Sequence, residues 1–517
     1  MREGCITFKI GTFGPNGEVM KLSECMKDIP YRSFSKMGDP DISGITDDSR
    51  CAGPGILFFG IRGTKQDGRR FLAEAERKGA VCVTDGVWSG AGRCLQVADT
   101  RRAYAACCQN FYEHPERFLV TVGVSGTKGK TSTTFLISSI LQAAGRTCGL
   151  IGTEGIWIGT KQLAPAANTT PEPHSLFFWL KKMVEAGCTH VVIEISSQAM
   201  KQHRIGTLRF DYGVFTNFSE DHIGAGEHAD LQEYLFWKQA FVYSCRHLVC
   251  RISEWRQFFF GRNRGFLPRT VCFGEKETPD CEYQLVRRGQ KKEPFSGSSC
   301  WFSYLCGKGQ RIQKFEITLS GEHQVWNGLA AFACTRQMGC SLAAQKKGLK
   351  TATVPGRGEL LCRGEITVLL DYAHNGASLE ALLRSVRTEW TGPIWCLFGC
   401  GGNRAKSRRV QMGRISGALA DLTILTEDNS RWEPVADILA QLEDGVQAAG
   451  GNCLVISDRE TAIRQSIRSA PRGTLLILAG KGRETYLERR GEKIPFSDSE
   501  TARNAFQSRK LRLRKKS

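Results

Sequence analysis

The residues best suited to chemistry lie in the stretch TVGVSGTKGKTSTT (121–134), where a short apolar run breaks into a glycine-rich loop. Gly126 and Gly129 leave backbone N–H groups free to point inward. Lys130 adds a positive charge, and the hydroxyl of Thr131 suits Mg²⁺. This order of residue types predicts a site for the phosphates of a nucleotide.

The glycine spacing in this loop departs from the strict P-loop pattern, which would place a glycine at Val124. The glycines stand instead at Gly123, Gly126 and Gly129. One alternative is a flexible turn before a helix. Because Lys130 is followed by four hydroxyl residues and then by the apolar run FLISSILQAA, phosphate binding is the favoured interpretation.

Length and composition describe a multidomain globular protein. The chain has 517 residues, of which 41% are apolar and 24% charged, and a chain of this length usually forms roughly three domains. No stretch approaches the ~18 apolar residues of a membrane-spanning helix. The first residues, MREGCITFKIGTFG, lack the apolar core of a secretory signal. We therefore expect a cytoplasmic protein without a membrane partner.

Cysteine usage and charge narrow the class further. The 21 cysteines are scattered without any C-x-x-C pair, which favours reduced thiols over a zinc site. The net charge of +19 suggests polyanionic partners, either nucleic acid or a highly anionic substrate. Part of the excess is local, since the tail SRKLRLRKKS carries six Lys or Arg, a pattern typical of a solvated terminus.

Apolar runs alternate with helical patterns along most of the chain, which predicts an α/β fold with parallel sheets. We expect three domains: a small α/β domain over 1–112, a central P-loop ATPase-like domain over 113–353, and a Rossmann-like domain over 354–517. Four apolar runs of the last domain (ITVLLD, IWCLF, LTIL and TLLILA) each end in a polar or glycine-rich turn. The stretch 251–312 predicts strands and long loops with little chemistry.

Polar residues at strand ends add candidates for a metal site. Glu194 ends the run VVIE, and His222 follows VFTNFSED, so both could reach a cation near Thr131. Lys238 lies in the aromatic-rich helical run EYLFWKQAF, where the residues alone favour a lysine that extends its ammonium group to the solvent.

Nine motifs in order closely resemble those of the Mur ligases, ATP-dependent enzymes that form amide bonds in peptidoglycan precursor synthesis. They are GTKGKTS, ANTTPEP, EISSQAMKQHRI, FTNFSEDH, VPGRGE, DYAHN, GCGGNR, DNSR and GKGRE. The resemblance covers nearly the whole chain, with 251–312 poorly matched. It implies that the chain adds the third residue of the stem peptide to UDP-N-acetylmuramoyl-L-alanyl-D-glutamate through an acyl-phosphate intermediate.

The resemblance also assigns roles to single residues, beginning with the catalytic set Lys130, Glu194, His222 and Lys238. Lys238 would be carbamylated, and its added carboxylate would hold Mg²⁺ together with Thr131, Glu194 and His222. The residues implied for ATP are Gly126, Thr127, Lys128, Gly129, Lys130, Thr131, Ser132, Asn327, Asp371 and His374. Those implied for the UDP-muramoyl dipeptide are Ser49, Asn168, Thr169, Thr170, Ser196, Gln202 and Arg204.

For the incoming amino acid the resemblance implies Arg404, Asp428, Asn429, Ser430, Arg431, Gly480 and Glu484. An arginine at 431 suits the extra carboxylate of meso-diaminopimelate, which lysine-adding relatives do not need to bind. The alternative substrate is L-lysine or another diamine. The alternative to a substrate-binding role is that Arg431 only forms an ion pair with Glu433. The chain departs from the family pattern at Ser430, which replaces a proline, and at Arg483, which replaces a histidine.

Two other functions stay open at this point. A basic P-loop ATPase that binds nucleic acid would show polynucleotide-stimulated hydrolysis with steep salt dependence, although no groove-reading motif is present. A ligand-binding relative without catalysis is the other, and the complete set of Lys130, Glu194, His222 and Lys238 argues against it. We expect a monomer whose partners are small molecules, ATP and Mg²⁺ among them, and no nucleic acid.

Overall fold

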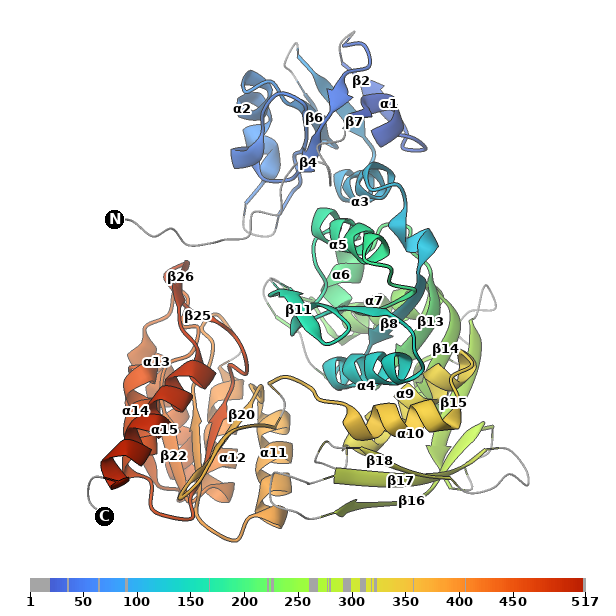
Figure 1. The fold of residues 1–517 in the computed structure, drawn as a ribbon. Helices are drawn as coiled ribbons and strands as arrows, with labels where there is room; N and C mark the ends of the chain where they lie inside the picture. The colour runs from blue at the N-terminus through green and yellow to red at the C-terminus, as the bar shows by residue number, and fades with distance from the viewer. Residues whose placement is uncertain are drawn as a thin grey trace. The chain divides into compact units, whose positions relative to one another are not determined.

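The computed structural model describes residues 19–34, 37–63, 66–88, 92–166, 168–220, 223–224, 227–259, 268–276, 278, 280–291, 299–306, 313–317, 319, 323–356, 358–404 and 406–514. Its contacts divide the chain into two compact units. The first unit comprises Met1–Gly274 and Ala330–Ser341, and the second comprises Glu275–Leu329 and Leu342–Ser517. Helices and strands alternate throughout, as Figure 1 shows, so the predicted α/β class is confirmed, while the three domain boundaries stay predictions.

The N-terminal part of the first unit is a five-stranded sheet in the order β2-β7-β6-β5-β4. Strands β4 to β7 are parallel, and β2 pairs with β7 antiparallel. The elements are β1 (Met20–Lys21), α1 (Leu22–Cys25), β2 (Tyr31–Ser33), β3 (Asp41–Ile42), β4 (Gly44–Thr46), a 3₁₀ turn (Ser49–Cys51), β5 (Ile56–Phe59), a 3₁₀ turn (Gly68–Phe71), α2 (Leu72–Arg77), β6 (Val81–Thr84), β7 (Cys94–Val97), α3 (Thr100–Phe111) and a 3₁₀ turn (Pro115–Phe118).

The central part of the first unit is a mostly parallel sheet in the order β11-β10-β9-β12-β8-β13-β14-β15. Only the edge strands β10 and β11 run antiparallel. The elements are β8 (Val120–Ser125), α4 (Lys130–Ala143), β9 (Cys148–Gly152), β10 (Gly155–Ile158), β11 (Lys161–Ala164), α5 (Pro173–Glu185), β12 (His190–Glu194), α6 (Ser197–Lys201), β13 (Phe210–Phe215), α7 (Leu231–Tyr243), β14 (Cys245–Arg251), α8 (Ile252–Glu254), a π turn (Trp255–Phe259) and β15 (Arg269–Glu275).

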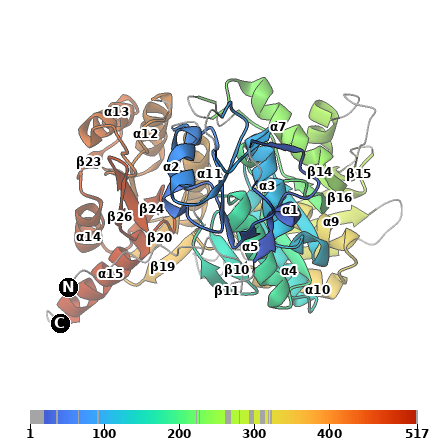
Figure 2. The same ribbon diagram turned by 90° about the horizontal axis from the view of Figure 1, so that it is seen from above.

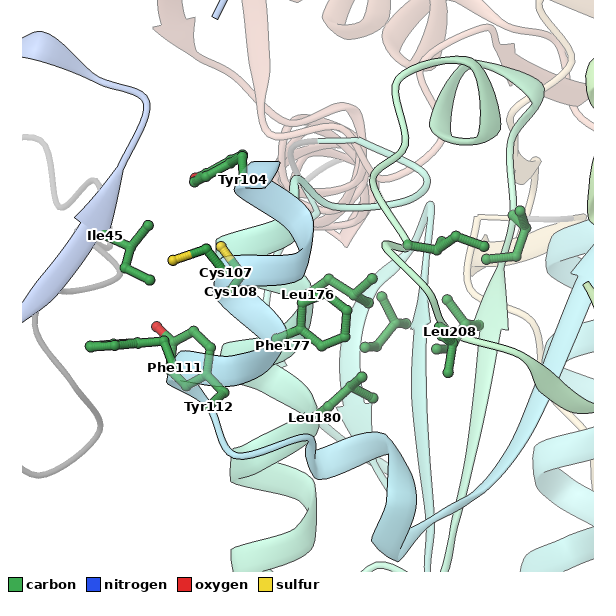
Figure 3. Packing of buried hydrophobic residues seen from close by; sticks show 14 of the residues in the cluster. Ile45, Tyr104, Cys107, Cys108, Phe111, Tyr112, Leu176, Phe177, Leu180 and Leu208 are labelled. Carbon is green, nitrogen blue, oxygen red and sulfur yellow. The ribbon is translucent and has the colours of Figure 1, made fainter. Parts of the chain in front are cut away.

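The core of the first unit is continuous from the N-terminal sheet into the central part. Helix α3 provides the junction: Tyr104 packs on Phe59 of β5 at 5.0 Å between ring centroids, and Tyr112 packs on His174 of α5 at 5.6 Å. Figure 3 shows α3 with Cys107 and Cys108 turned toward Ile45, and the α5 residues Leu176, Phe177 and Leu180 turned toward the central sheet.

The two helices that border the predicted phosphate loop begin at clear local signals. Helix α4 begins at Lys130, directly after Gly129, whose φ of +81° is a left-handed conformation that glycine adopts without strain. Helix α7 begins after Asp230, whose side chain accepts a hydrogen bond from the Glu233 N–H at 2.8 Å. The helical run EYLFWKQAF predicted around Lys238 is thus confirmed as part of α7.

The second unit begins with three antiparallel strands, β16 (Tyr283–Lys291), β17 (Ser299–Cys306) and β18 (Gln313–Ile317). Helices α9 (His323–Gln337) and α10 (Leu342–Thr351) follow, and α9 continues into the part assigned to the first unit. The strands predicted for 251–312 are therefore present in its described residues.

A six-stranded sheet in the order β19-β20-β24-β21-β22-β23 forms the rest of the second unit, parallel except for β19. Its elements are β19 (Glu359–Arg363), β20 (Thr367–Asp371), α11 (Gly376–Glu389), β21 (Ile394–Phe398), α12 (Ser407–Leu419), β22 (Leu422–Leu425), α13 (Val435–Ala448), β23 (Cys453–Val455), α14 (Arg459–Ser469), β24 (Leu475–Ala479), β25 (Tyr486–Arg489), β26 (Glu492–Pro495) and α15 (Asp498–Arg514). The four strands predicted here are confirmed as β20, β21, β22 and β24.

Helices cover both faces of this sheet. Residues of α11, α12 and α13 share one buried cluster with the strands, and residues of α14 and α15 share the other. Figure 2 shows the two helical layers on opposite sides of β20, β23 and β24. The carboxyl ends of β20, β21, β22 and β24 therefore meet at one edge, where ligands of open α/β sheets bind.

Two further predictions concern the cysteines and membrane-spanning helices. The described cysteines are free thiols, and burial raises the pKa of several of them, among them Cys82 and Cys94 to about 12. This fits the prediction of reduced, unreactive thiols. Among the helices in the described residues, none is long and apolar enough to cross a bilayer.

Candidate active site

The glycine loop between β8 and α4 is fixed by the segment that follows β13. The Thr127 N–H donates to the Asn217 carbonyl at 2.8 Å, and the Lys128 N–H donates to the Asn217 side-chain oxygen at 2.9 Å. The Asn217 amide returns a hydrogen bond to the Lys128 carbonyl at 2.9 Å. Asn217 thus fixes the conformation of the loop, a role that the loop's own sequence does not reveal.

Gly126 is required by this close approach. Its φ is +137°, and a Cβ built on it would lie 2.0 Å from the Thr216 hydroxyl oxygen and 3.0 Å from the Asn217 backbone nitrogen. The Gly126 carbonyl accepts hydrogen bonds from two ammonium groups, that of Lys130 at 3.0 Å and that of Lys238 at 2.7 Å. The loop therefore brings together two of the predicted catalytic residues.

Replacing Gly126 with alanine is expected to lower kcat/KM for ATP by about 10- to 100-fold, because the added methyl group must displace Thr216 or the loop itself. Initial rates over a range of ATP concentrations would measure the effect. Gly145→Ala is the matched control: it lies just after α4 with a φ of +76° and open space around its Cβ position. That variant should lose some stability but keep its ATP dependence, and equal kinetic losses in the two variants would contradict the explanation.

Glu194 lies at the buried end of β12, and three donors surround its carboxylate. The Thr131 hydroxyl donates at 3.2 Å, and the Thr153 N–H and hydroxyl donate at 3.1 Å each. Gly152 permits this approach, since a Cβ there would lie 2.3 Å from a Glu194 oxygen. Thr131 and Glu194, predicted to hold one cation, are in direct contact, whereas Thr153 was missed because the β9–β10 turn carries no motif.

Lys238 is 1% exposed and does not extend to the solvent. Its ammonium group donates to the Gly126 carbonyl and, at 3.2 Å, to the Ser125 hydroxyl, and it lies 5.5 Å from the centroid of the Tyr234 ring. The prediction from the residues alone, a lysine that extends its ammonium group to the solvent, is therefore wrong. His222 lies outside the described residues, so its predicted role stays a prediction.

The described donors fit Mg²⁺. No cluster of three or more His, Cys, Asp or Glu that could hold a metal occurs among the described residues. The hydroxyl of Thr131 and the carboxylate of Glu194 are nevertheless hard oxygen ligands in contact at the loop. Mg²⁺ usually takes one or two protein oxygens and completes its shell with water and phosphate. The pair is sufficient for such a site.

The residues predicted to bind the UDP-muramoyl dipeptide form a hydrogen-bonded chain beside Glu194. The Thr170 hydroxyl donates to the Glu194 carbonyl at 2.8 Å and accepts from the Ser196 N–H at 3.0 Å. Arg204 donates to the Thr170 carbonyl at 2.7 Å and to the Gln202 side-chain oxygen at 2.7 Å. Four of the predicted residues are thus in mutual contact.

The other members of this predicted set lie in different places. Thr169 shares a hydroxyl hydrogen bond of 3.1 Å with Thr153, and Asn168 directly precedes it. Ser49 begins a 3₁₀ turn of the N-terminal sheet, and its carbonyl accepts from the Lys78 ammonium group at 3.1 Å. The structure therefore does not bring Ser49 into the hydrogen-bonded chain of Thr170, Ser196, Gln202 and Arg204.

Sequence reasoning missed Glu172, which pairs with Arg204 at 2.8 Å. Burial raises the pKa of the Glu172 carboxyl, and the charge of Arg204 opposes that shift. Burial likewise lowers the pKa of Arg204, against the charge of Glu172. The pair holds Arg204 in the orientation in which it meets Thr170. The only sequence signal for Glu172 was its position in the motif ANTTPEP.

Within the second unit, three of the residues predicted for the amino acid contact Lys481, which is fully buried. Its ammonium group donates to Asp428 at 3.4 Å, to the Asn429 side-chain oxygen at 3.2 Å and to Glu484 at 2.9 Å. Burial alone would raise the pKa of the Asp428 carboxyl, but the charges of Lys481 and Arg459 outweigh it and the pKa lies below its usual range. The site therefore holds an ionised carboxylate at neutral pH.

The loops that carry this group are joined backbone to backbone. The Gly402 N–H donates to the Asn429 carbonyl at 2.9 Å, and the Gly480 N–H donates to the Asp371 carbonyl at 3.1 Å. Gly401, beside Arg404, lies near the Arg431 guanidinium, since a Cβ there would be 3.2 Å from Arg431 Nη1. Ser430, which precedes Arg431 in the chain, is buried.

The simple pair of Arg431 with Glu433 is wrong. Glu433 accepts instead from the Asn403 N–H and pairs with the buried Arg409 at 2.8 Å. Arg431 contacts Gly402 and Glu488. The guanidinium is therefore held between the turn after β21, which carries Gly402, and strand β25, which carries Glu488.

The remaining predicted nucleotide contacts also lie in the second unit. The Asp371 carboxylate accepts from the Gly358 N–H at 2.7 Å and from the Ala373 N–H at 2.8 Å. His374 contacts the Tyr372 carbonyl through Nδ1 at 2.9 Å. Asn327 is buried in α9 and donates to the Gln324 side-chain oxygen at 3.0 Å. The ends of β20 and α9 thus hold these three side chains in defined orientations.

Two family descriptions match the chain: the Mur ligase middle domain over residues 124–335, and the Mur ligase glutamate ligase domain over residues 356–482. A UDP-N-acetylmuramoyl-L-alanyl-D-glutamate--2,6-diaminopimelate ligase of Geobacillus thermodenitrificans is 35% identical over 95% of this chain and 100% of its own length. A ligase of the same name from Aquifex aeolicus is 33% identical over 89% of this chain and 93% of its own length.

Solved structures share the fold. A structure described as UDP-N-acetylmuramoyl-L-alanyl-D-glutamate--2,6-diaminopimelate ligase superposes with a TM-score of 0.63 at 24% identity, covering 95% of this chain and all of that chain. The MurF ligase of Thermotoga maritima in complex with ADP gives a TM-score of 0.60 at 16% identity, with 91% of this chain and 98% of that chain covered. Both support the predicted architecture of a P-loop-like core with flanking domains.

Proposed function

The chain belongs to the Mur ligase family of ATP-dependent, amide-bond-forming ligases, and from this premise we propose that it joins meso-diaminopimelate to UDP-N-acetylmuramoyl-L-alanyl-D-glutamate in peptidoglycan precursor synthesis. The names of its relatives support this substrate pair. The observation in the structure that supports the proposal is a linked set of charged and polar groups: Arg431 pairs with Glu488, the Glu488 N–H donates to Asn429, and Asn429 contacts Lys481 and Glu484. A cationic and an anionic contact together suit a substrate that brings both a carboxylate and ammonium groups.

In the first step a carboxylate oxygen of the D-glutamyl residue attacks the γ-phosphorus of ATP, and the bond to the β,γ-bridging oxygen breaks. The products are an acyl phosphate and ADP. Lys130 and the loop N–H groups would stabilise the charge on the transferred phosphoryl group. When bound, Mg²⁺ would screen the phosphate charges, and Thr131 and Glu194, with the predicted His222 and carbamylated Lys238, would hold it.

In the second step the amine of the amino acid attacks the acyl carbon, and inorganic phosphate leaves with its electron pair as the amide forms. The attacking nitrogen must lose a proton before or during this step. Arg204, held by Glu172, would orient the dipeptide in the first unit. Asp428 and Glu484 would orient the ammonium end of the amino acid, and Arg431 its far carboxylate.

An amino-acid panel tests this function. Purified protein, ATP, Mg²⁺ and the UDP-dipeptide are incubated with meso-diaminopimelate, L-lysine, L-ornithine or no amino acid, and phosphate release and product mass are measured. We expect a tripeptide product and one phosphate per product with meso-diaminopimelate, at a kcat/KM at least about 100-fold above that with L-lysine, because L-lysine has no second carboxylate to meet the Arg431 guanidinium. A product with L-lysine alone would overturn the amino-acid assignment. If no amino acid in the panel causes phosphate release, the function is wrong.

The cellular setting forms part of the same proposal. We infer a cytoplasmic monomer, because its proposed substrates are ATP and a UDP-linked precursor. The high positive charge then serves to attract these anionic substrates, in place of the nucleic acid that was considered first.

A further inference from the structure

The backbone of Arg431 is clamped in a conformation that non-glycine residues adopt rarely. Its φ is +53°, in the left-handed region. Its N–H donates to the Glu488 carbonyl at 2.9 Å, and its carbonyl accepts from the Arg490 N–H at 2.5 Å. These two bonds tie the turn after β22 to strand β25 and set the direction in which the Arg431 side chain leaves the backbone.

The guanidinium of Arg431 is then held on two sides. Its Nη1 donates to the Gly402 carbonyl at 2.6 Å, and its Nε pairs with the Glu488 carboxylate at 3.3 Å. Both side chains are about four-fifths buried, with 23% and 20% exposed. Within the described part of the chain, Nη2 makes no hydrogen bond or ion pair. The contacts thus leave Nη2 as the guanidinium nitrogen available to a ligand.

Glu488 is also tied to the rest of the amino-acid group. Its N–H donates to the Asn429 side-chain oxygen at 2.9 Å, and the same oxygen accepts from Lys481 at 3.2 Å. The Asn429 amide nitrogen donates to Glu484 at 2.9 Å. The position of Glu488 is therefore coupled to Asn429, Lys481 and Glu484, and Arg431 is held in register with them.

We propose that Glu488 is a positioning residue that fixes Arg431 and thereby selects an incoming amino acid with a second carboxylate. This inference rests on the proposed function. A fixed guanidinium meets a carboxylate without first losing its own side-chain freedom, which favours the diacid. The same guanidinium cannot turn away to water when a lysine occupies the site, so in the lysine complex its Nη2 gains no carboxylate partner although the side chain is only 23% exposed.

Two substitutions separate two properties of Glu488: the oxygen that accepts from Arg431 and the negative charge. Glu488→Gln keeps an oxygen that can accept from Arg431 Nε, whereas Glu488→Ala removes that partner. We expect Glu488→Ala to raise KM for meso-diaminopimelate about 10-fold with kcat within about 2-fold, and to lower the preference for meso-diaminopimelate over L-lysine by at least about 10-fold. Glu488→Gln should stay within about 3-fold of the parent in both quantities.

Glu492→Ala is the matched control, because Glu492 lies exposed on β26 of the same hairpin. The assays include KM for ATP and the unfolding temperature, which should be unchanged in all three variants. If the parent protein makes no product with meso-diaminopimelate, the proposed function fails. If it does and Glu488→Ala keeps the parent's KM and preference, or loses kcat, ATP affinity and stability together without recovery in Glu488→Gln, the positioning role is wrong.

Discussion

Lys238→Ala is expected to lower kcat by about 10²- to 10³-fold, the loss typical of removing one preorganised electrostatic contact at a transition state. The residue is buried against the phosphate loop, where its ammonium group reaches the Gly126 carbonyl and the Ser125 hydroxyl. Single-turnover phosphate release would measure the effect on the first step. Lys182→Ala, which breaks a pair with Glu185 on α5 that is about one-third exposed, should leave the rate unchanged.

Chemical rescue then tells which charge Lys238 carries during catalysis. If its nitrogen is carbamylated, small carboxylates such as acetate should restore activity to Lys238→Ala by at least about 10-fold, because they replace a metal-binding oxygen. If it acts as an ammonium group, alkylammonium ions should restore activity instead. Activity of Lys238→Ala equal to that of the parent would remove the residue from the catalytic set.

Asp498→Ala is expected to lower the free energy of unfolding of the second unit by about 3–5 kcal/mol, since it leaves a buried guanidinium without its counter-charge. Arg459 and Asp498 are both fully buried, and two hydrogen bonds of 2.8 and 2.7 Å join them. Arg459 also donates to the Glu427 carbonyl at 3.1 Å and the Ala479 carbonyl at 3.0 Å. Urea unfolding would measure the loss.

Glu460→Ala provides the control for that prediction, because it breaks an exposed pair with Arg464 on α14 and should cost less than about 0.5 kcal/mol. The double variant Arg459→Leu with Asp498→Leu should recover much of the loss, since it removes both buried charges. An Asp498→Ala protein that unfolds at the parent's urea concentration would show that Arg459 finds another partner.

The elements that carry strong local signals could be predicted from the sequence. Apolar runs that end in polar turns identified the four parallel strands of the C-terminal sheet, and the glycines with Lys130 and Thr131 identified the loop. The closeness of Thr131 and Glu194, predicted to hold one cation, followed as well, because Glu194 ends the strand beside β8 and Thr131 follows β8 after the glycine loop. Periodicity and strand-end position were sufficient for these features.

Tertiary contacts between distant segments could not be predicted. The residues around Lys238 alone favoured a lysine that reaches the solvent, because an aromatic helix offers no polar partner of its own, whereas its partners lie on the loop about a hundred residues earlier. The Arg431 partner was sought at Glu433, two residues away, and lies at Glu488 on another strand. Lys481 and Arg459 carry no local pattern that distinguishes them from surface cations, and only the packed fold reveals their burial.

The carbonyl of Gly126 receives two ammonium groups, and this has a consequence for the resting state of the loop. Two like charges share one uncharged oxygen, so they repel each other as long as no anion lies between them. A triphosphate would remove that repulsion by neutralising both charges. Carbamylation of Lys238 would remove it too, since the modified nitrogen keeps an N–H for Gly126 while its charge changes from positive to negative. Before the substrate binds, the loop thus carries two positive charges that repel each other. Lys238, which carbamylation would make negative, is one of these two charges.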